Sequence, residues 1–279
     1  MTRISFALSR RRLTSLSLLV VLGASLIGPA FASAATTPVD AVTLTGQEAR
    51  MVSLLNADRA ALGLVPIQVD SRLMALARAR SADMIARNYF SHTLPDGRNV
   101  FDFLTSGKIA WYGAGEILAW NNYPMDVTAS TANHQWLNSP GHKAIVVSTN
   151  FNYFGVGLAV DAATGKKMWT AVYIKGPDRT GARVTLATPT VSTGTTTTIN
   201  KVTLAWSGAD VRLQVLTAGL RSYVIQRKFD SGSWNPVTDT TGGSLSLAAL
   251  VGHVHQFRIA AYDRAGNLGP WSTRIVDLR

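Results

Sequence analysis

Two histidines and one glutamate lie beside expected breaks in the secondary structure of the first half of the chain. His92 comes just after one expected helix, His142 just after another, and Glu116 lies between them in a glycine-flanked segment, residues 113–119. Imidazole nitrogens and carboxylate oxygens are ligands that suit Zn²⁺, and the same groups transfer protons near neutral pH. Spacing along the chain does not show that the three residues converge. The alternative is a set of hydrogen-bonded structural histidines.

The segment that positions these residues alternates helical and strand patterns from about residue 40 to 175. Thr45 and Glu48 form a capping-box pattern at the start of a helix that Gly63 ends. The stripe expected to be buried on this helix consists of Met51, Leu55, Arg59 and Leu62. Further helices are expected at 70–88, at 99–106 and from 126 or 128 to before Pro140, and strands at 155–160 and 167–174. Helices followed by an antiparallel hairpin predict an α+β sandwich.

From about Lys175 the sequence changes to turn residues and β-formers. Alternating apolar and polar residues recur at 202–206, 223–227 and 256–261, with glycine, asparagine and proline between them. Short strands punctuated in this way predict an all-β sandwich. We therefore expect a linker at 176–183 and a second domain at 184–279.

The amino terminus has the pattern of an export signal. An arginine-rich start precedes an apolar run at 13–31 and a small-x-small site at 32–34. This pattern predicts a signal peptide at 1–34, a flexible lead-in at 35–44, and an extracellular or cell-surface protein. The alternative is a retained membrane anchor, and the general secretory and twin-arginine routes both stay open. No later segment approaches the ~20 apolar residues that a membrane span needs.

Charge and cysteine content exclude several classes of function. The formal net charge is +11, and loss of the four arginines in residues 1–34 lowers it to +7. The remaining basic residues are scattered, which argues against nucleic acid as a partner and favours mild attraction to an anionic surface such as a cell wall. Among them are Arg78, Arg80, Arg87, Lys166, Lys167, Arg227 and Lys228. The absence of cysteine excludes thiol catalysis and cysteine-based metal sites.

Five short motifs follow one another between residues 45 and 175. They are Leu54-Leu55-Asn56-x-x-Arg59, Tyr89-Phe90-Ser91-His92, Gly115-Glu116, Trp136-x-Asn138-Ser139-Pro140-Gly141-His142 and Gly155-Val156-Gly157. Their order and spacing resemble the compact bacterial type of the CAP superfamily, which includes cysteine-rich secretory proteins, antigen 5 and pathogenesis-related proteins. The resemblance implies a three-layer α-β-α sandwich over residues 45–175. It also implies a cleft in which His92 and His142 take the two histidine places and Glu116 the first glutamate place.

The chain departs from the family pattern at three places near this cleft. Ser139 stands where larger members have a second glutamate, as is usual for the bacterial type. Ile117 replaces the asparagine that commonly follows the cleft glutamate, and Ile145 replaces another beyond the second histidine. We expect these changes to remove polar groups near the rim and to narrow the chemistry of the cleft.

The expected site is a weak, exchangeable Zn²⁺ site formed by His92, His142 and Glu116, in which the glutamate is either a ligand or the base that orients a water. The alternative is a polar network that binds a ligand or holds the loops together. We favour binding over catalysis and leave the ligand open among a small molecule, a lipid and a cell-wall glycan. A serine triad is excluded, because neither Ser91 nor Ser139 lies in a Gly-x-Ser-x-Gly elbow.

The second domain resembles a fibronectin type III module. Trp206 matches the tryptophan of its second strand, Tyr223 the aromatic of its third, and residues 257–267 its ending, whereas His255 stands at the place of the corner tyrosine. Such modules act as spacers or contact surfaces. The whole chain is therefore expected to be a secreted or cell-surface CAP-domain protein. The alternatives are a metal-assisted hydrolase of peptide or cell-wall bonds and an adhesion protein with an idle cleft.

Overall fold

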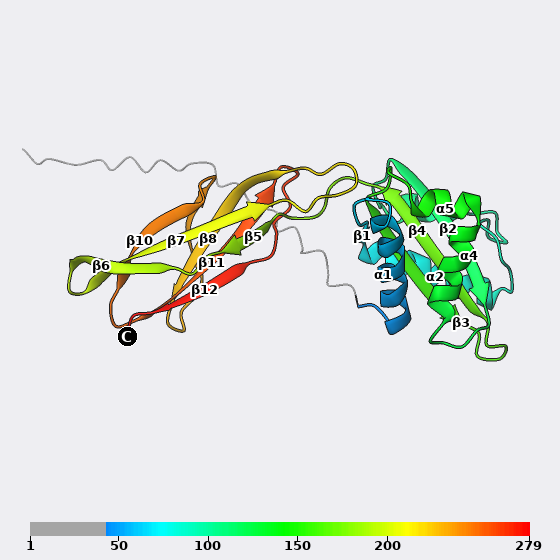
Figure 1. Cartoon of the computed structure of the whole chain (residues 1–279), viewed down its shortest axis with the longest axis horizontal. Coiled ribbons are helices and arrows are strands. Elements are labelled where there is room, and N and C mark those ends of the chain that lie inside the picture. The colour runs from blue at the N-terminus through cyan, green and yellow to red at the C-terminus, as the bar shows by residue number, and fades with distance from the viewer. Residues whose placement is uncertain (1–42) are drawn as a thin grey trace, which may run out of the picture. The chain divides into compact units, whose positions relative to one another are not determined.

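The structure is a computed structural model that describes residues 43–279 (Figure 1). The expected signal peptide at 1–34 and most of the lead-in at 35–44 lie outside the described residues. Within residues 43–279, no helix combines the length and the apolar character needed to cross a membrane.

The first half of the described chain is built on a four-stranded sheet with the order β1-β3-β4-β2. Its strands are β1 (Gln68–Val69), β2 (Gly113–Asn121), β3 (Tyr153–Val160) and β4 (Lys167–Lys175). The predicted β3–β4 hairpin is confirmed as an antiparallel pair, and β1 adds to β3 in parallel. The expectation that the glycine-flanked segment 113–119 is a break in the secondary structure is wrong, because this segment pairs with β4 along its whole length as edge strand β2.

Helices cover both faces of this sheet (Figure 1). They are α1 (Gly46–Ala60), α2 (Ser71–Ala86), α3 (Val100–Ser106), α4 (Thr128–Asn138) and α5 (Pro140–Val146). On one face, Met51 of α1 and Trp136 of α4 join a buried core with Trp169 of the sheet. On the other, Leu73 of α2 and Leu104 of α3 pack with residues of β3 and β4. The mixed α and β fold predicted for this region is confirmed.

The helix ends largely follow the sequence signals. Thr45 and Glu48 form the predicted capping box of α1, and the Asp70 side chain accepts a hydrogen bond from the Arg72 backbone N–H at the start of α2. The prediction that Leu62 belongs to the buried stripe of α1 is wrong, because the helix ends at Ala60 and the Leu62 side chain is exposed.

Two glycines of β3 let α2 lie directly on the sheet. A Cβ atom added to Gly157 would lie 2.2 Å from the backbone nitrogen of Arg78, and one added to Gly155 would lie 2.1 Å from the carbonyl carbon of Leu73. No side chain fits such a separation. The Ser81 hydroxyl of α2 also holds this helix against β3, because it donates a hydrogen bond of 2.9 Å to the Gly157 carbonyl oxygen.

The second half of the chain contains two sheets around one core. The strands of the first are β5 (Arg183–Leu186), β6 (Thr190–Thr196), β7 (Ile199–Ala209) and β10 (Ser244–Leu250). Those of the second are β8 (Leu220–Phe229), β9 (Asn235–Thr240), β11 (Val254–Asp263) and β12 (Ser272–Asp277). Side chains of both sheets, including Trp206 of β7 and Tyr223 of β8, share a buried cluster, as expected for a β-sandwich.

The histidines of the second half do not face one another. His255 is fully buried and its Nε2 lies 2.9 Å from the Leu250 carbonyl oxygen, whereas the half-exposed His253 lies just before β11 and pairs with Asp230. The guanidinium carbon of Arg258 lies 4.4 Å from the ring centroid of Trp234 and 4.3 Å from that of Trp271.

Candidate functional site

The structure brings together the three residues singled out in the sequence, and each comes from a different element. His92 lies in the loop between α2 and α3, Glu116 lies on edge strand β2, and His142 lies in α5. His92 Nδ1 is 2.8 Å from Glu116 Oε2, and the centroids of the two imidazole rings are 6.5 Å apart. Because β2 is the outer strand, side chains from the loop and from α5 can meet beside it.

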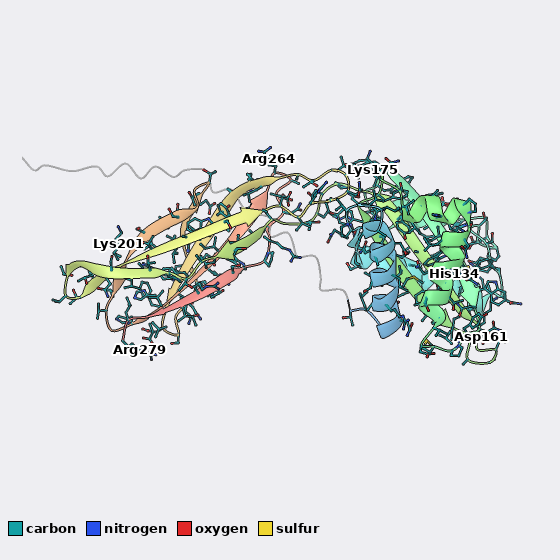
Figure 2. The ribbon with its side chains drawn as sticks, viewed as in Figure 1. His134, Asp161, Lys175, Lys201, Arg264 and Arg279 are labelled. Carbon is teal, nitrogen blue, oxygen red and sulfur yellow. The ribbon has the colours of Figure 1, made fainter. Side chains whose placement is uncertain are left out.

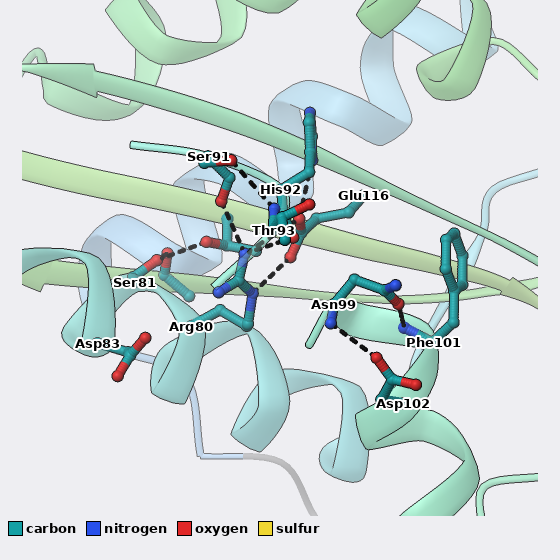
Figure 3. A network of polar contacts seen from close by, with 12 residues as sticks. Arg80, Ser81, Asp83, Ser91, His92, Thr93, Asn99, Phe101, Asp102 and Glu116 are labelled. Atoms are coloured by element: carbon teal, nitrogen blue, oxygen red, sulfur yellow. Dashed lines mark hydrogen bonds and ion pairs between the residues drawn. The ribbon is translucent and has the colours of Figure 1, made fainter. Parts of the chain in front are cut away.

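A fourth residue, Arg80 of α2, organises this cluster (Figure 3). Its Nε donates to Glu116 Oε1 over 2.9 Å, and its Nη2 donates to the backbone oxygens of Ser91 and His92 over 3.0 and 3.2 Å. Its Nη1 donates to the Tyr89 hydroxyl over 2.7 Å. The Arg80 and Glu116 side chains are only 2% and 3% exposed, so this is a buried ion pair that also holds the His92 loop.

The prediction that Arg80 is one of the scattered basic residues is therefore wrong, because its side chain is buried. Its signal in the sequence was its position, because Leu73, Ala77, Arg80 and Met84 follow helical spacing and are all buried on α2. A charged residue in the apolar stripe of a helix indicates a buried partner, since an isolated charge is too costly to bury.

The contact with Glu116 defines which nitrogen of His92 is free. A carboxylate can only accept hydrogen bonds, so the proton of this contact lies on His92 Nδ1, and in the neutral imidazole the lone pair is then on Nε2. This is the arrangement in which a carboxylate orients a metal-binding or proton-accepting histidine. Glu116 itself is occupied by Arg80 and His92, which makes it a positioning group.

His142 offers the second nitrogen donor. It lies in the first turn of α5, which begins with Pro140, and within residues 43–279 no hydrogen bond of its ring is found. Burial lowers the pKa of His142, and the nearby charge of His92 lowers it further. The neutral imidazole therefore persists to lower pH than that of a free histidine.

We expect His142 to titrate below pH 6.5 in a metal-free NMR titration of the ring protons. Because its pKa is lower in the folded state than in the unfolded state, its contribution to stability is complete above about pH 6.5 and is lost as the pH falls through the folded-state value. His92→Ala is expected to raise the midpoint of His142 only part of the way, since burial remains. A midpoint at or above 6.5 in the wild type would contradict this environment.

The other positions named near the cleft fall into two groups. Ser139 joins α4 to α5 and lines a cavity together with His142. The expectation that Ile117 lies at the rim is wrong, because it is fully buried in the core on the sheet face opposite Glu116. Ile145 packs beside Gly115, with its Cδ1 atom 3.2 Å from where a Cβ of Gly115 would lie. His134 is exposed on α4 (Figure 2). Its Nε2 lies 2.8 Å from the side-chain amide nitrogen of Asn138.

The donor set fits a divalent metal held by His92 Nε2 and a nitrogen of His142. Zn–N bonds of about 2.0–2.1 Å place the centroids of two coordinating imidazoles roughly 5–6 Å apart. The observed 6.5 Å needs a small approach of the two rings, and the His92 side chain, which is 57% exposed, has room for it. Two protein ligands make a weak site, and a metal bound there would polarise a ligand or water at its open positions.

A separate group of carboxylates lies in the second half of the chain. Oxygen atoms of Asp178, Asp210 and Asp263 lie within 4.8 Å of one another. Backbone N–H groups donate to all three, including that of Ala218 to Asp178 over 2.7 Å. Burial and then the charge of Asp178 contribute to a raised pKa of Asp210. The three carboxylates therefore hold the surrounding loops together through hydrogen bonds to backbone N–H groups.

A sheet between two helical layers, with two histidines and a carboxylate beside its edge strand, defines the class of the first half as a CAP-like α-β-α fold. Residues 52–173 match the family model of CAP, the cysteine-rich secretory protein family.

Similar proteins occur in Bacillus. The uncharacterized protein YkwD of Bacillus subtilis (strain 168) is 34% identical over 148 residues, which are 52% of this chain and 54% of that protein. The uncharacterized membrane protein YlbC of the same strain is 30% identical over 131 residues, which are 47% of this chain and 35% of that protein. The chain thus spans about half or less of the length of these curated relatives. A solved extracellular protein of Bacillus anthracis str. Ames that contains an SCP domain is 29% identical, covering 47% of this chain and 40% of that chain, with a TM-score of 0.40.

Proposed function

We propose that this is an exported CAP-domain protein whose cleft at His92 and His142 binds a small ligand or a divalent metal at the cell surface. The observation that carries the proposal is the chain of contacts from Arg80 through Glu116 to His92. The buried Arg80–Glu116 ion pair orients the His92 imidazole so that its Nε2 is free. The imidazole of His142, whose pKa is lowered, lies next to it. A purely structural histidine does not need a free ring nitrogen.

The arginine-rich, apolar leader supports export, and the C-terminal sandwich is assigned as a fibronectin type III-like spacer or contact module. Its sheet orders, β10-β7-β5 and β12-β11-β8-β9, and the burial of Trp206 and Tyr223 support this assignment. We rank binding above metal-assisted hydrolysis because both oxygens of Glu116 already accept hydrogen bonds, so it is poorly placed to act as a base. An adhesion protein with an idle cleft is the remaining alternative.

Calorimetric titration of the metal-free exported chain with Zn²⁺ tests the proposal. We expect weak 1:1 binding that falls at least tenfold in His92→Ala and in His142→Ala, since each loses one of two ligands. Glu116→Gln is expected to bind about 10- to 100-fold more weakly, because the orientation of His92 is lost. His134→Ala is the matched control and should bind as the wild type does. Equal binding by all four variants would exclude the His92–His142 site.

A further inference from the structure

The cleft continues beyond His142 into a groove at the end of β2. The groove has a volume of about 410 Å³ and is built from the end of β2, the loop after it, α4 and the loop that carries His92. The residues that matter for its chemistry are Phe90, Trp120, Asn122, Tyr123, Gln135 and His142. Its volume lies within the range of sites for small ligands.

The groove has an unusual concentration of exposed aromatic side chains. Phe90, Trp120 and Tyr123 are 47%, 43% and 57% exposed, although the sheet and helices beside them bury comparable residues completely. Single exposed aromatic residues are common, but several around one groove are typical of an interaction site. Their flat faces suit a ligand that stacks on them.

We call the exposed rings of Phe90, Trp120 and Tyr123 the aromatic platform. Hydrogen bonds hold the backbone at the end of β2, which carries Trp120, in place. Asn121 is buried at the end of β2, and its Oδ1 accepts a hydrogen bond of 2.9 Å from the Thr128 hydroxyl. Gln135 of α4 donates to the carbonyl oxygen of Trp120 over 3.3 Å. These contacts tie the end of the edge strand to α4, so the rings are presented by a rigid support.

The polar groups around the rings indicate the chemical class of the ligand. None of the residues that line the groove is acidic, and the exposed Asn122 and Gln135 offer amide groups. Lys166 lies over one face of the Trp120 ring, with its Nζ 4.8 Å from the ring centroid. The aromatic rings suit a ligand with C–H faces, and the amides suit polar substituents on it. The ammonium group favours a ligand that is neutral or negatively charged. An acyl chain offers nothing to the amide and ammonium groups.

We propose that this groove binds a glycan strand, with sugar rings stacked on Trp120 and Tyr123 and their amide or carboxylate substituents near Asn122, Gln135 and Lys166. The proposal rests on the ligand-binding function proposed for the adjoining cleft and names the class of ligand. The sugar contacts and the His92–His142 pair occupy neighbouring parts of one depression, since His142 lines both.

The test uses the exported chain and two probes, insoluble peptidoglycan sacculi in a sedimentation assay and a soluble N-acetylglucosamine tetramer in calorimetry. We expect the wild type to bind both, and Trp120→Ala and Tyr123→Ala each to bind at least tenfold more weakly with unchanged circular dichroism. Tyr112→Ala is the matched control, because Tyr112 is 66% exposed in the same domain but does not line the groove, and it should bind as the wild type does.

Zinc titration of the same variants separates this proposal from the proposed function. We expect Trp120→Ala to keep zinc affinity while losing glycan, and His92→Ala to lose zinc affinity while keeping glycan. Failure of the wild type to bind either probe, or undiminished binding by Trp120→Ala, would overturn the glycan proposal and leave the zinc result standing. Binding to phosphatidylglycerol vesicles in place of the glycan probes, with the same dependence on Trp120, would also overturn it.

Discussion

Replacing Arg80 by leucine is expected to lower the free energy of unfolding by about 3–5 kcal/mol, because it leaves the buried Glu116 carboxylate without its cation. The two side chains are 2% and 3% exposed, so water cannot take the place of the guanidinium. The variant also loses the hydrogen bonds to the Ser91 and His92 carbonyl oxygens. Urea unfolding followed by circular dichroism measures the change.

Two further variants show whether the ion pair is the cause. The double variant Arg80→Leu/Glu116→Leu removes both charges and is expected to recover a large part of the lost stability. Arg87→Leu removes an exposed arginine at the end of the same helix, whose ion pair with Asp83 is 35% and 31% exposed, and should cost no more than about 1 kcal/mol. A loss below about 1 kcal/mol in Arg80→Leu would mean that the pair is not buried as described.

Replacing Gly157 by alanine is expected to destabilise the fold by about 3 kcal/mol or more, at or above the upper end of the usual cost of overpacking. The added Cβ would meet the backbone nitrogen of Arg78 at 2.2 Å and the carbonyl carbon of Ala77 at 2.3 Å. Backbone atoms cannot turn aside as a side chain can, so α2 must move away from β3. Because α2 carries Arg80, we also expect weaker zinc binding.

Gly113→Ala is the control for this prediction, since it places the same methyl group in the same sheet. The nearest atom would be the Lys175 Cβ at 3.8 Å, an ordinary contact. We expect its unfolding free energy to stay within about 0.5 kcal/mol of the wild type. Equal effects of the two substitutions would show that loss of glycine matters in general, and that the close approach of α2 does not.

Local signals predicted the long elements well. Thr45, Asp70 and Asn99 cap α1, α2 and α3 where expected, and Gly63, with a φ of 71°, follows the end of α1. Such signals depend on hydrogen bonds within a few residues, so they can be recognised without knowledge of the tertiary structure.

The elements that escaped prediction depend on contacts distant in sequence. β2 contains Gly113 and Gly115, which weaken a strand pattern, and it becomes a strand because β4 pairs with it. α5 has only seven residues and follows α4 directly, so its apolar pattern is too short to recognise.

In the candidate site, too, some features could be predicted from the sequence and others depend on contacts between distant segments. The types and spacing of His92, Glu116 and His142 do not by themselves show that these residues converge. The family resemblance predicts that they share a cleft, and in the structure they lie together. The helical spacing of Arg80 indicates that it is buried, but it does not identify Glu116 as the partner, because that contact depends on the pairing of β2 with β4, which turns Glu116 towards α2.

The central claim is that Glu116 holds His92 so that its Nε2 and His142 form one binding site. Long-range ¹H–¹⁵N NMR of the histidine rings during a Zn²⁺ titration tests it most directly. We predict a protonated Nδ1 and a bare Nε2 on His92 before zinc is added. On addition, His92 Nε2 and one nitrogen of His142 should shift together while His134 stays unchanged. A bare Nδ1 on His92, or rings that do not respond to zinc, would contradict the account.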